Sequence, residues 1–327
     1  MKIACQFFVS CLLFGACIAA PGYSSLDDEW HEWKVVYNKV YATPGEELHR
    51  RRIWEENLDF IEAHNNRAAS TYTLGMNEFG DQRVSEKTRM NVRVSSQDNT
   101  LALENNTLAL EDNTLTFSSS SFDWRKKGVI TAVKNQGMIG SSEALVVTES
   151  VQSYHAIKTS ELPDVSVQEV VDCCSIPGHS EVRPIVDDCF GCVHNIGGLC
   201  SSIAYKGGRC NNGSCTATAQ VEGTKTVTPG KEDEMARVLR EQVPLMVYVD
   251  ASHGSFQFYK SGVYHDSTCS KHQMDHSLQI VGYGVIDDIL YWICKNSWGE
   301  NWGQKGYIWM RRGTNECGIA TRVKYPF

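Results

Sequence analysis

The stretch from Leu26 to Asn66 carries apolar residues at helical spacing. Trp30 and Trp33 are three residues apart and Tyr37 follows four residues later, before Pro44 interrupts the run. After Pro44, six residues recur every three or four positions and would share one helix face: Glu47, Arg51, Trp54, Asn57, Ile61 and Asn65. The pattern therefore predicts two amphipathic helices that separate near Pro44.

A different periodicity follows these helices. The segment GMNEFGD, residues 75–81, alternates polar and apolar positions between turn glycines, which predicts a short strand. Residues 95–121 then contain three near-copies of a seven-residue unit, DNTLALE, NNTLALE and DNTLTFS. Because the apolar residues of these copies are spaced two and five apart rather than three and four, a coiled coil is disfavoured. The polar, repetitive composition predicts an exposed linker instead.

The rest of the chain divides into a helical half and a strand-rich half. One helix is expected to begin near Ser141, and another to cover KEDEMARVLREQV, residues 231–243. From Pro244 onward the short β segments are PLMVYVD, HSLQIVGYG, LYWICKNSW and GYIWMRR. Helices followed by strands predict an α+β domain of two packed lobes.

The first 20 residues have the layout of a secretory signal peptide. Lys2 precedes an apolar run from Phe7 to Ala20, and Pro21 and Gly22 follow. The run is too short for a comfortable membrane span, and no second stretch approaches about 18 apolar residues. A buried N-terminal helix is the alternative. We favour a signal peptide and expect a soluble protein of the secretory pathway, located outside the cell or in a lysosome-like vesicle.

Composition narrows the chemistry. Of the 13 cysteines, Cys5, Cys11 and Cys17 lie in the signal, and the ten that remain predict disulfides in a secreted chain. Their spacing lacks a zinc-ligand pattern, so we expect no metal and no cofactor. A net charge of −8 without basic stripes argues against a nucleic-acid partner. Asn105 and Asn212 begin sequons and are candidate glycosylation sites.

Four segments resemble the signatures of the papain family of cysteine proteases: FDWRKKGVITAVKNQG, GSSEAL, DHSLQIVGYG and KNSWGENWGQKGYIWM. The helix face after Pro44 resembles that family's interspersed propeptide motif, with Trp54 in place of a Phe. Gly75, Asn77, Phe79 and Asp81 match its second propeptide motif. The two propeptide motifs are typical of the cathepsin L-like branch.

The resemblance implies a papain-like two-lobe α+β fold, with a helical first lobe and a β-barrel-like second lobe behind a helical inhibitory prosegment. The expected domains are a signal peptide at 1–20, a propeptide inhibitor domain at 21–90, a repeat-containing linker at 91–118 and a peptidase-like domain at 119–327.

The resemblance also assigns a catalytic constellation. In the family, a Cys at the start of the central helix forms a thiolate–imidazolium pair with a His from the other lobe. Carried over by motif, Ser142 holds the nucleophile position, and His276 is the base. Asn296 would orient the imidazole and Trp298 would cover Asn296. Gln136 would form the oxyanion hole together with the backbone N–H of the nucleophile.

The nucleophile position departs from the family pattern. A hydroxyl ionises far less readily than a thiol, and the orienting Asn296 is neutral. Glu143 also replaces the bulky aromatic residue that the family has beside the nucleophile. Three roles for Glu143 are open: it favours the helix N-terminus electrostatically, it holds His276 in a static ion pair, or it acts as a surrogate triad acid, a role for which its position is unsuited.

Residues of the substrate cleft are assigned by the same resemblance. The segment GCVHNIGG, residues 191–198, is similar to the family's substrate turn but has extra residues, which implies a remodelled edge. The predicted substrate-binding residues are Gly197, Gly198, Leu199, Met274, Asp275 and Arg322. Arg322 falls at the bottom of the main side-chain pocket, where it would narrow the pocket or favour an acidic side chain. A surface arginine on a shifted strand is the alternative.

Disulfide partners follow from the resemblance as well. Cys269 with Cys317 matches the second-lobe bridge of the family, and Cys173 with either Cys210 or Cys215 matches a first-lobe bridge. Ile139 stands where the family has a Cys, so Cys192 has either another partner or none.

Three functions remain in competition, and the sequence does not decide whether the protein is an enzyme. We favour a catalytically impaired pseudoprotease that binds peptides, protease inhibitors of the cystatin type or related proteases, with its own prosegment as a further partner. The second reading is peptide hydrolysis by Ser142 with His276. The third is a structural or matrix protein.

Overall fold

The computed structural model describes residues 26–88, 121–137, 141–176, 184–210, 213 and 215–327. The expected signal peptide and the expected linker at 91–118 lie outside these residues, and so do both sequon asparagines, Asn105 and Asn212, and Ile139. Backbone contacts divide the chain into two units, Met1–Glu47 and Leu48–Phe327.

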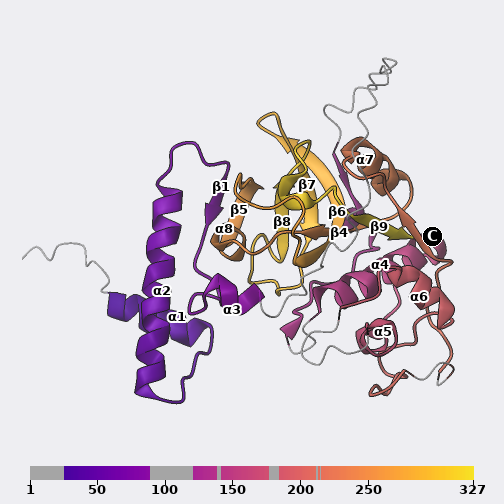
Figure 1. The fold of residues 1–327 in the computed structure, drawn as a ribbon, viewed down its shortest axis with the longest axis horizontal. Helices are drawn as coiled ribbons and strands as arrows, with labels where there is room; N and C mark the ends of the chain where they lie inside the picture. Colours follow the sequence, from indigo (N-terminus) through magenta and orange to yellow (C-terminus); the bar gives the residue numbers. More distant parts are fainter. Residues whose placement is uncertain (1–25, 89–120, 138–140, 177–183, 211–212, 214) are drawn as a thin grey trace, which may run out of the picture. The chain divides into compact units, whose positions relative to one another are not determined.

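The first unit contains helix α1 (Leu26–Val36) and the start of α2 (Pro44–Asn65) (Figure 1). Trp30 and Trp33 are buried, and their rings stack with centroids 5.2 Å apart. Pro44 is the first residue of α2, a position where the missing N–H of proline leaves no helical hydrogen bond unmade. The prediction of two helices that separate near Pro44 is confirmed.

The second unit continues from α2 into strand β1 (Tyr72–Leu74) and helix α3 (Val84–Thr88). The strand predicted over residues 75–81 is wrong, since β1 ends at Leu74 and turns follow. The side chain of Asn77 explains the difference. It accepts a hydrogen bond from the N–H of Phe79 at 3.0 Å and donates one to the carbonyl of Gln257 at 2.8 Å, which replaces ladder pairing by a turn.

The remaining elements form a helical lobe and a strand-rich lobe, as expected. The helical lobe begins with β2 (Phe122–Asp123) and a 3-10 helix (Trp124–Lys127) and contains α4 (Ser142–Thr159), α5 (Val167–Cys174) and α6 (Cys189–Asn195). The rest comprises β3 (Thr224–Thr226), α7 (Glu232–Glu241), β4 (Leu245–Val249), α8 (Gly254–Gln257), β5 (Tyr259–Tyr264), β6 (His276–Ile286), β7 (Ile289–Lys295), β8 (Tyr307–Arg311), a 3-10 helix (Glu316–Gly318) and β9 (Val323–Pro326).

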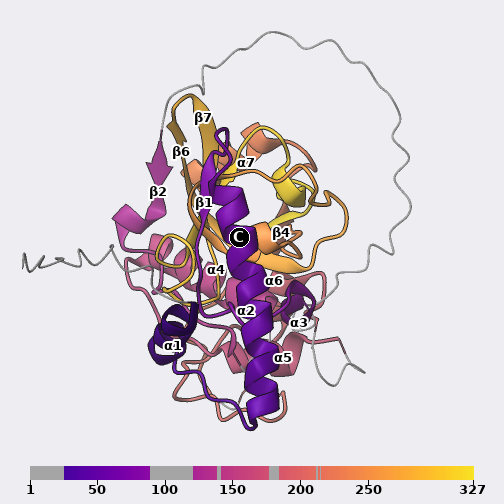
Figure 2. The ribbon, with the colours of Figure 1, turned by 90° about the vertical axis from the view of Figure 1, so that its left-hand side faces the viewer.

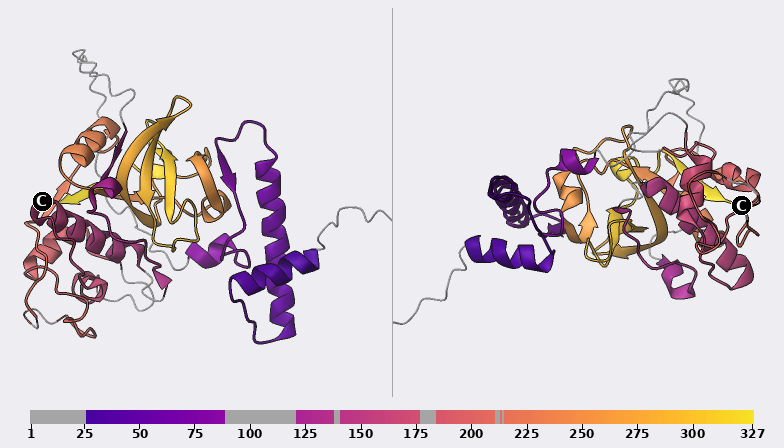
Figure 3. Two further views of the ribbon diagram at one scale, coloured as in Figure 1. Left: turned by 180° about the vertical axis from the view of Figure 1, so that it is seen from behind. Right: turned by 90° about the horizontal axis from the view of Figure 1, so that it is seen from below.

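One mixed sheet runs through these strands in the order β1-β5-β8-β7-β6-β4-β9-β3. Strand β2 pairs with β6, next to which it is drawn in Figure 2. Helices α4, α5 and α6 stay together on one side of this sheet (Figures 1 and 3). The prosegment strand β1 pairs antiparallel with β5, so the expected prosegment forms the edge of the sheet.

Strand β4 separates two hydrophobic cores. Its residues alternate between them: Leu245, Val247 and Val249 belong to the core of the strand-rich lobe, whereas Met246 and Tyr248 belong to the core shared with α4, α5 and α6. This alternation is what a strand buried on both faces produces. The two sides of β4 therefore face different surroundings, which decides the direction of each side chain at the candidate site.

Candidate active site

Ser142 is the first residue of α4, the long helix at the centre of the helical lobe. The helix begins as the sequence indicates, because Ser141 is its N-cap and accepts a hydrogen bond from the N–H of Ala144 at 3.1 Å. The Ser142 hydroxyl oxygen accepts a hydrogen bond of 3.2 Å from the N–H of Ser277. Since Ser277 directly follows His276, this contact brings the expected nucleophile position next to the expected base, at the positive end of a helix dipole.

His276 opens β6 and is held by Asn296, which directly follows β7. The ring Nε2 of His276 lies 2.7 Å from Oδ1 of Asn296, and the same oxygen accepts the N–H of Ser297 at 2.8 Å. Two donors on one oxygen fix the orientation of the amide, so Nε2 carries a proton and Nδ1 is the basic nitrogen of the neutral ring. The Trp298 ring lies 4.9 Å from the imidazole, centroid to centroid, and excludes water from this pair.

Gln136 lies across from this pair on the loop before α4. Its side-chain oxygen accepts hydrogen bonds from the Trp298 indole at 3.2 Å and from the Ser297 hydroxyl at 2.9 Å. Its backbone N–H donates to the Ser297 carbonyl at 2.8 Å. These contacts turn the amide NH₂ away from Trp298, the orientation that a donor to an oxyanion needs. All the catalytic residues that the resemblance assigned are thus linked in one buried network.

Glu143 points away from this network, which settles the roles left open for it. Its Oε1 accepts a hydrogen bond of 2.5 Å from the Tyr248 hydroxyl, and its Oε2 accepts one of 3.0 Å from the N–H of Ile185. Tyr248 pairs with Ser277 across β4 and β6, whereas Val249 pairs with His276. Directly paired residues share a face and successive residues alternate, so the Glu143–Tyr248 bond and the His276 ring lie on opposite faces of the sheet. Glu143 is neither an ion-pair partner of His276 nor a triad acid.

Burial dominates the electrostatics of Glu143. The side chain is 5 % exposed, and this loss of hydration raises its pKa, although the Tyr248 hydroxyl, the Ile185 N–H and the positive charges of Lys324 and Arg322 oppose the rise. Burial beside the Glu143 carboxylate also raises the pKa of the Tyr248 phenol well above 10. The phenol is therefore always the donor in this pair.

Arg322 is not a free cation at the bottom of a pocket. Its guanidinium forms an ion pair with Asp187 and lies 5.0 Å from the centre of the Tyr248 ring. The ammonium of Lys324 binds the same Asp187 carboxylate at 2.6 Å. The prediction that Arg322 attracts an acidic side chain loses its basis, because Asp187 already supplies the counter-charge. The guanidinium covers Tyr248 instead.

Met274 and Asp275 lie next to the network, at the entrance to β6. Met274 is 4 % exposed and packs in the same core as Tyr248. The carboxylate of Asp275 accepts the N–H of Ala251 at 2.8 Å, and burial raises its pKa to about 6. Both residues are near the candidate site, but neither presents an open pocket.

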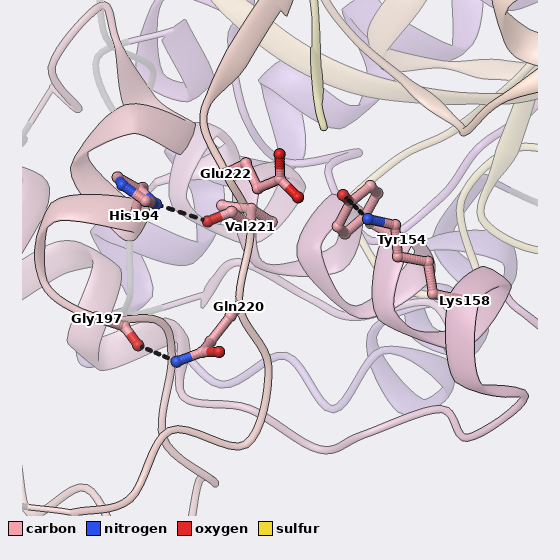
Figure 4. A pocket seen from close by; sticks show the side chains of 7 residues that line it. All are labelled: Tyr154, Lys158, His194, Gly197, Gln220, Val221 and Glu222. Carbon is pink, nitrogen blue, oxygen red and sulfur yellow. Dashed lines mark hydrogen bonds between the residues drawn. The ribbon is translucent and has the colours of Figure 1, made fainter.

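The assignment of Gly197, Gly198 and Leu199 to the cleft is corrected by the structure. Gly197 lines a cavity of about 360 Å³ with Tyr154 and Lys158, at the far end of α4 (Figure 4). Lys158 comes 16 residues after Ser142, about 24 Å along the helix. The backbone of Gly198 lies so close to the Ala219 carbonyl that a Cβ would be 2.6 Å from its oxygen, and Leu199 is fully buried.

The local sequence explains the correction. Asp188 is the N-cap of α6, and its carboxylate accepts the N–H of Gly191 at 3.2 Å, so residues 189–195 are a helix rather than an edge of the cleft. Gly197 and Gly198 then adopt positive φ angles of 88° and 108° as the chain leaves that helix. Gly197 and Gly198 thus match the glycines of the family's substrate turn in residue type but not in position within the fold. The N-cap residue Asp188 and the four residues between Cys192 and Gly197 were the signals that could have indicated a helix.

Four disulfides are present among the described residues: Cys173–Cys210, Cys174–Cys192, Cys200–Cys215 and Cys269–Cys317. Cys192, whose partner the sequence left open, is bonded to Cys174. Cys189 and Cys294 are buried thiols, and burial raises the pKa of Cys189 to about 12. Both metal-like side-chain clusters in the described part consist mainly of cysteines that these disulfides already use.

Known proteins resemble the chain over almost its whole length. A family model described as papain family cysteine protease matches residues 118–327, and one described as cathepsin propeptide inhibitor domain matches residues 30–86. Procathepsin L of Felis catus is 35% identical, with 98% of both chains covered. Cathepsin R of Mus musculus is 34% identical, with 99% of both chains covered. The structure of digestive procathepsin L 3 from Tenebrio molitor larval midgut superposes with a TM-score of 0.78 at 31% identity, over 93% of this chain and 99% of that one.

Proposed function

Because the chain belongs to the papain family of cysteine proteases and is a cathepsin L-like zymogen homologue, we propose that it is a catalytically impaired member that binds its targets instead of cleaving them. The observation that carries the proposal is the hydroxyl of Ser142 at the start of α4, beside an imidazole whose other nitrogen is held by a neutral amide. In this proposal Ser142, His276, Asn296 and Gln136 occupy the catalytic positions, and Trp298 shields them.

The chemistry of the network supports this assignment. A thiol, with an ordinary pKa of about 8.5, can rest as a thiolate beside an imidazolium, whereas a hydroxyl has to lose its proton during the attack itself. Serine hydrolases assist that step with a carboxylate that stabilises the imidazolium. Here Asn296 occupies the orienting position, and the carboxylate of Glu143 lies on the other face of the sheet. The group that orients His276 at Nε2 is therefore an amide, which brings no negative charge to a developing imidazolium.

Weak hydrolysis by Ser142 is the second candidate, and one observation favours it. The His276–Asn296 hydrogen bond of 2.7 Å and the fixed Gln136 amide provide an oriented base and an oxyanion donor without further movement. These two elements alone give residual catalysis in other hydrolases after the nucleophile is lost.

Peptides, inhibitors of the cystatin type and related proteases are the proposed targets, and the chain's own prosegment is the first occupant. The Phe79 ring packs edge-on against Trp298, 5.6 Å between centroids. Gln257 donates from its amide to the carbonyls of Phe79 and Gln82 at 3.2 and 3.1 Å. Residues at the edge of the candidate site thus already hold a turn of the prosegment in the zymogen. None of the described helices has both the length and the apolarity of a membrane span, and we propose a location in the secretory pathway, outside the cell or in a lysosome-like vesicle.

The test is a comparison of peptidase activity after prosegment removal. The first variant, Ser142→Cys, restores the thiol alone. The second combines Ser142→Cys with Glu143→Trp, which restores the aromatic neighbour, and with Tyr248→Ala, which removes the phenol that Glu143 contacts in the wild type. We expect no turnover by the wild type and at least a 100-fold gain over Ser142→Ala in one of the Cys variants, the range that a positioned nucleophile contributes. Wild-type turnover that disappears in Ser142→Ala would instead establish hydrolysis by the serine.

A further inference from the structure

Tyr248 belongs to the core of the helical lobe and lies close to the start of α4. Its ladder neighbour Ser277 is the residue whose N–H binds the Ser142 hydroxyl. Its own hydroxyl binds Glu143, the residue after Ser142. The ring packs in the same core as Met274, two residues before His276. Tyr248 thus binds the residue after Ser142 through its hydroxyl and pairs through its backbone with the residue after His276.

The ring is closed in on its outer side by two cations. Strand β9 pairs with β4 through Met246–Lys324 and Val247–Val323, so Arg322 falls opposite Tyr248 at the end of this ladder. The guanidinium carbon of Arg322 and the ammonium of Lys324 lie 5.0 and 5.5 Å from the ring centre. Asp187 binds both cations and keeps them in place. As a result Tyr248 is only 1% exposed.

From this arrangement we infer that Tyr248 fills, from inside the protein, the space beside Ser142 that would otherwise receive a ligand side chain. The cleft therefore selects extended peptides that carry glycine or alanine at this position and excludes large apolar side chains. The inference rests on the proposed peptide binding and names its specificity. Glu143 is a positioning residue here, since its carboxylate holds the phenol in the filled position.

The hydrogen bonds around the Tyr248 hydroxyl stabilise this position of the ring. The hydroxyl of Tyr248 and both oxygens of Glu143 are hydrogen-bonded, and the bond lies in a buried site where leaving either partner unpaired is costly. If the Tyr248 ring rotated away to admit a ligand side chain, the Glu143 carboxylate would lose the hydrogen bond from the Tyr248 hydroxyl, and no water would replace it. The selectivity is therefore built into the folded state.

The test uses Ser142→Ala protein without its prosegment, so that peptides stay intact whether or not the serine hydrolyses them. The probes are pairs of labelled tetrapeptides. The two members of a pair differ at one position, which is Gly in one and Phe in the other, and each position of the peptide is varied in turn. Two variants remove the ring: Tyr248→Ala, and Tyr248→Ala combined with Glu143→Ala. The double variant removes both partners of the hydrogen bond and serves if the single variant does not fold. Tyr248→Phe is the matched control, because it deletes the hydroxyl but keeps the ring.

The parent and Tyr248→Phe are expected to prefer the Gly peptide at one position. Both Ala variants should shift the Phe:Gly affinity ratio toward Phe by about 10-fold or more, the gain from burying an aromatic side chain in the vacated space. An unchanged ratio in a folded Ala variant overturns the inference, and so does the absence of measurable binding to every variant. Hydrolysis of peptides by the wild type, measured separately, would contradict the proposed function while leaving this ratio as an independent result.

Discussion

At the scale of single residues, the buried carboxylate of Asp275 beside the candidate site makes the stability of the fold depend on pH. One carboxylate oxygen accepts the Ala251 N–H, whereas the other, Oδ2, is buried without a hydrogen-bond partner. A pKa of about 6 instead of the ordinary 3.8 means that ionised Asp275 destabilises the fold by up to about 3 kcal/mol. This cost is absent below the unfolded-state pKa, grows as the pH rises between the two values, and is complete above pH 6.

Asp275→Asn is therefore expected to raise the melting temperature at pH 7.5 and to leave it nearly unchanged at about pH 3, below the unfolded-state pKa of 3.8, where wild-type Asp275 is mostly protonated in both states. The amide keeps an oxygen for Ala251 and carries no charge. Thermal denaturation at the two pH values measures the difference, and Asp59→Asn, on the exposed side of α2, is the control. An equal change at both pH values would show that the charge of Asp275 is not what destabilises the fold.

Matching of sequence motifs predicted the positions of some site residues but not the direction of every side chain. His276 and Asn296 were assigned correctly as neighbours because each belongs to a long signature around a strand, where backbone pairing fixes the register. The direction of Glu143 was not predictable, since it depends on Tyr248, which is 105 residues away in sequence. A side chain at a helix start can point to several partners, and only the fold decides which one is present.

At the scale of elements, the pairing of β1 with β5 depends on one glycine. Gly262 has a φ of +90°, and a Cβ there would lie 2.4 Å from the Thr71 carbonyl oxygen and 2.8 Å from Cα of Tyr72. The hydroxyl of Thr71 donates to the Val263 carbonyl at 2.6 Å, which keeps the two backbones close. No side chain fits between the prosegment strand and the lobe at this point.

Gly262→Ala is expected to detach β1, because the strain of a positive φ and the contact with the Thr71 carbonyl act together. Gly313 is a matched control: its φ is +91°, but nothing lies within 4 Å of its Cβ position. Gly313→Ala thus has the backbone strain, about 1 kcal/mol, without the contact. Hydrogen exchange of the amides of Tyr72 to Leu74 should become fast only in Gly262→Ala. Equal protection in both variants would contradict the importance of this contact.

Element boundaries were predictable from sequence only where local signals agreed with the tertiary structure. The helices α1, α2, α4 and α7 begin near the residues that their caps and periodicity indicated. Residues 75–81 had the alternation of a strand, but Asn77 bonds to the backbone of Gln257, on a distant part of the chain. Alternation reports which side chains are buried, and a turn that buries Asn77 and Phe79 gives the same pattern.

At the scale of the molecule, disulfides are concentrated in the helical lobe. Three of the four described bridges lie within residues 173–215, where the regular structure among the described residues consists of the end of α5 and the short α6. Cross-links stabilise such a stretch because they restrict the unfolded chain. The unusual Cys174–Cys192 bridge connects α5 to α6 directly.

Replacing Cys174 and Cys192 by Ala is expected to lower the free energy of unfolding by about 3 kcal/mol, the size expected for a loop of this length. Chemical denaturation under non-reducing conditions measures the loss. Cys294→Ala serves as the control, because it removes a buried sulfur that belongs to no bridge. A loss in the double variant no larger than in Cys294→Ala would indicate that the cross-link adds nothing.

The pairing of β1 with β5 has a consequence for how the protein behaves in concentrated solution. Once the prosegment is gone, the backbone donors and acceptors of Tyr259 to Gly262 face solvent as an open strand edge, next to the aromatic rings that Tyr72 and Phe79 had covered. Such an edge readily pairs with the same edge of another molecule and leads to self-association. The prosegment would therefore also act as a cover that keeps the molecules dispersed, whether or not the peptidase domain cuts peptides.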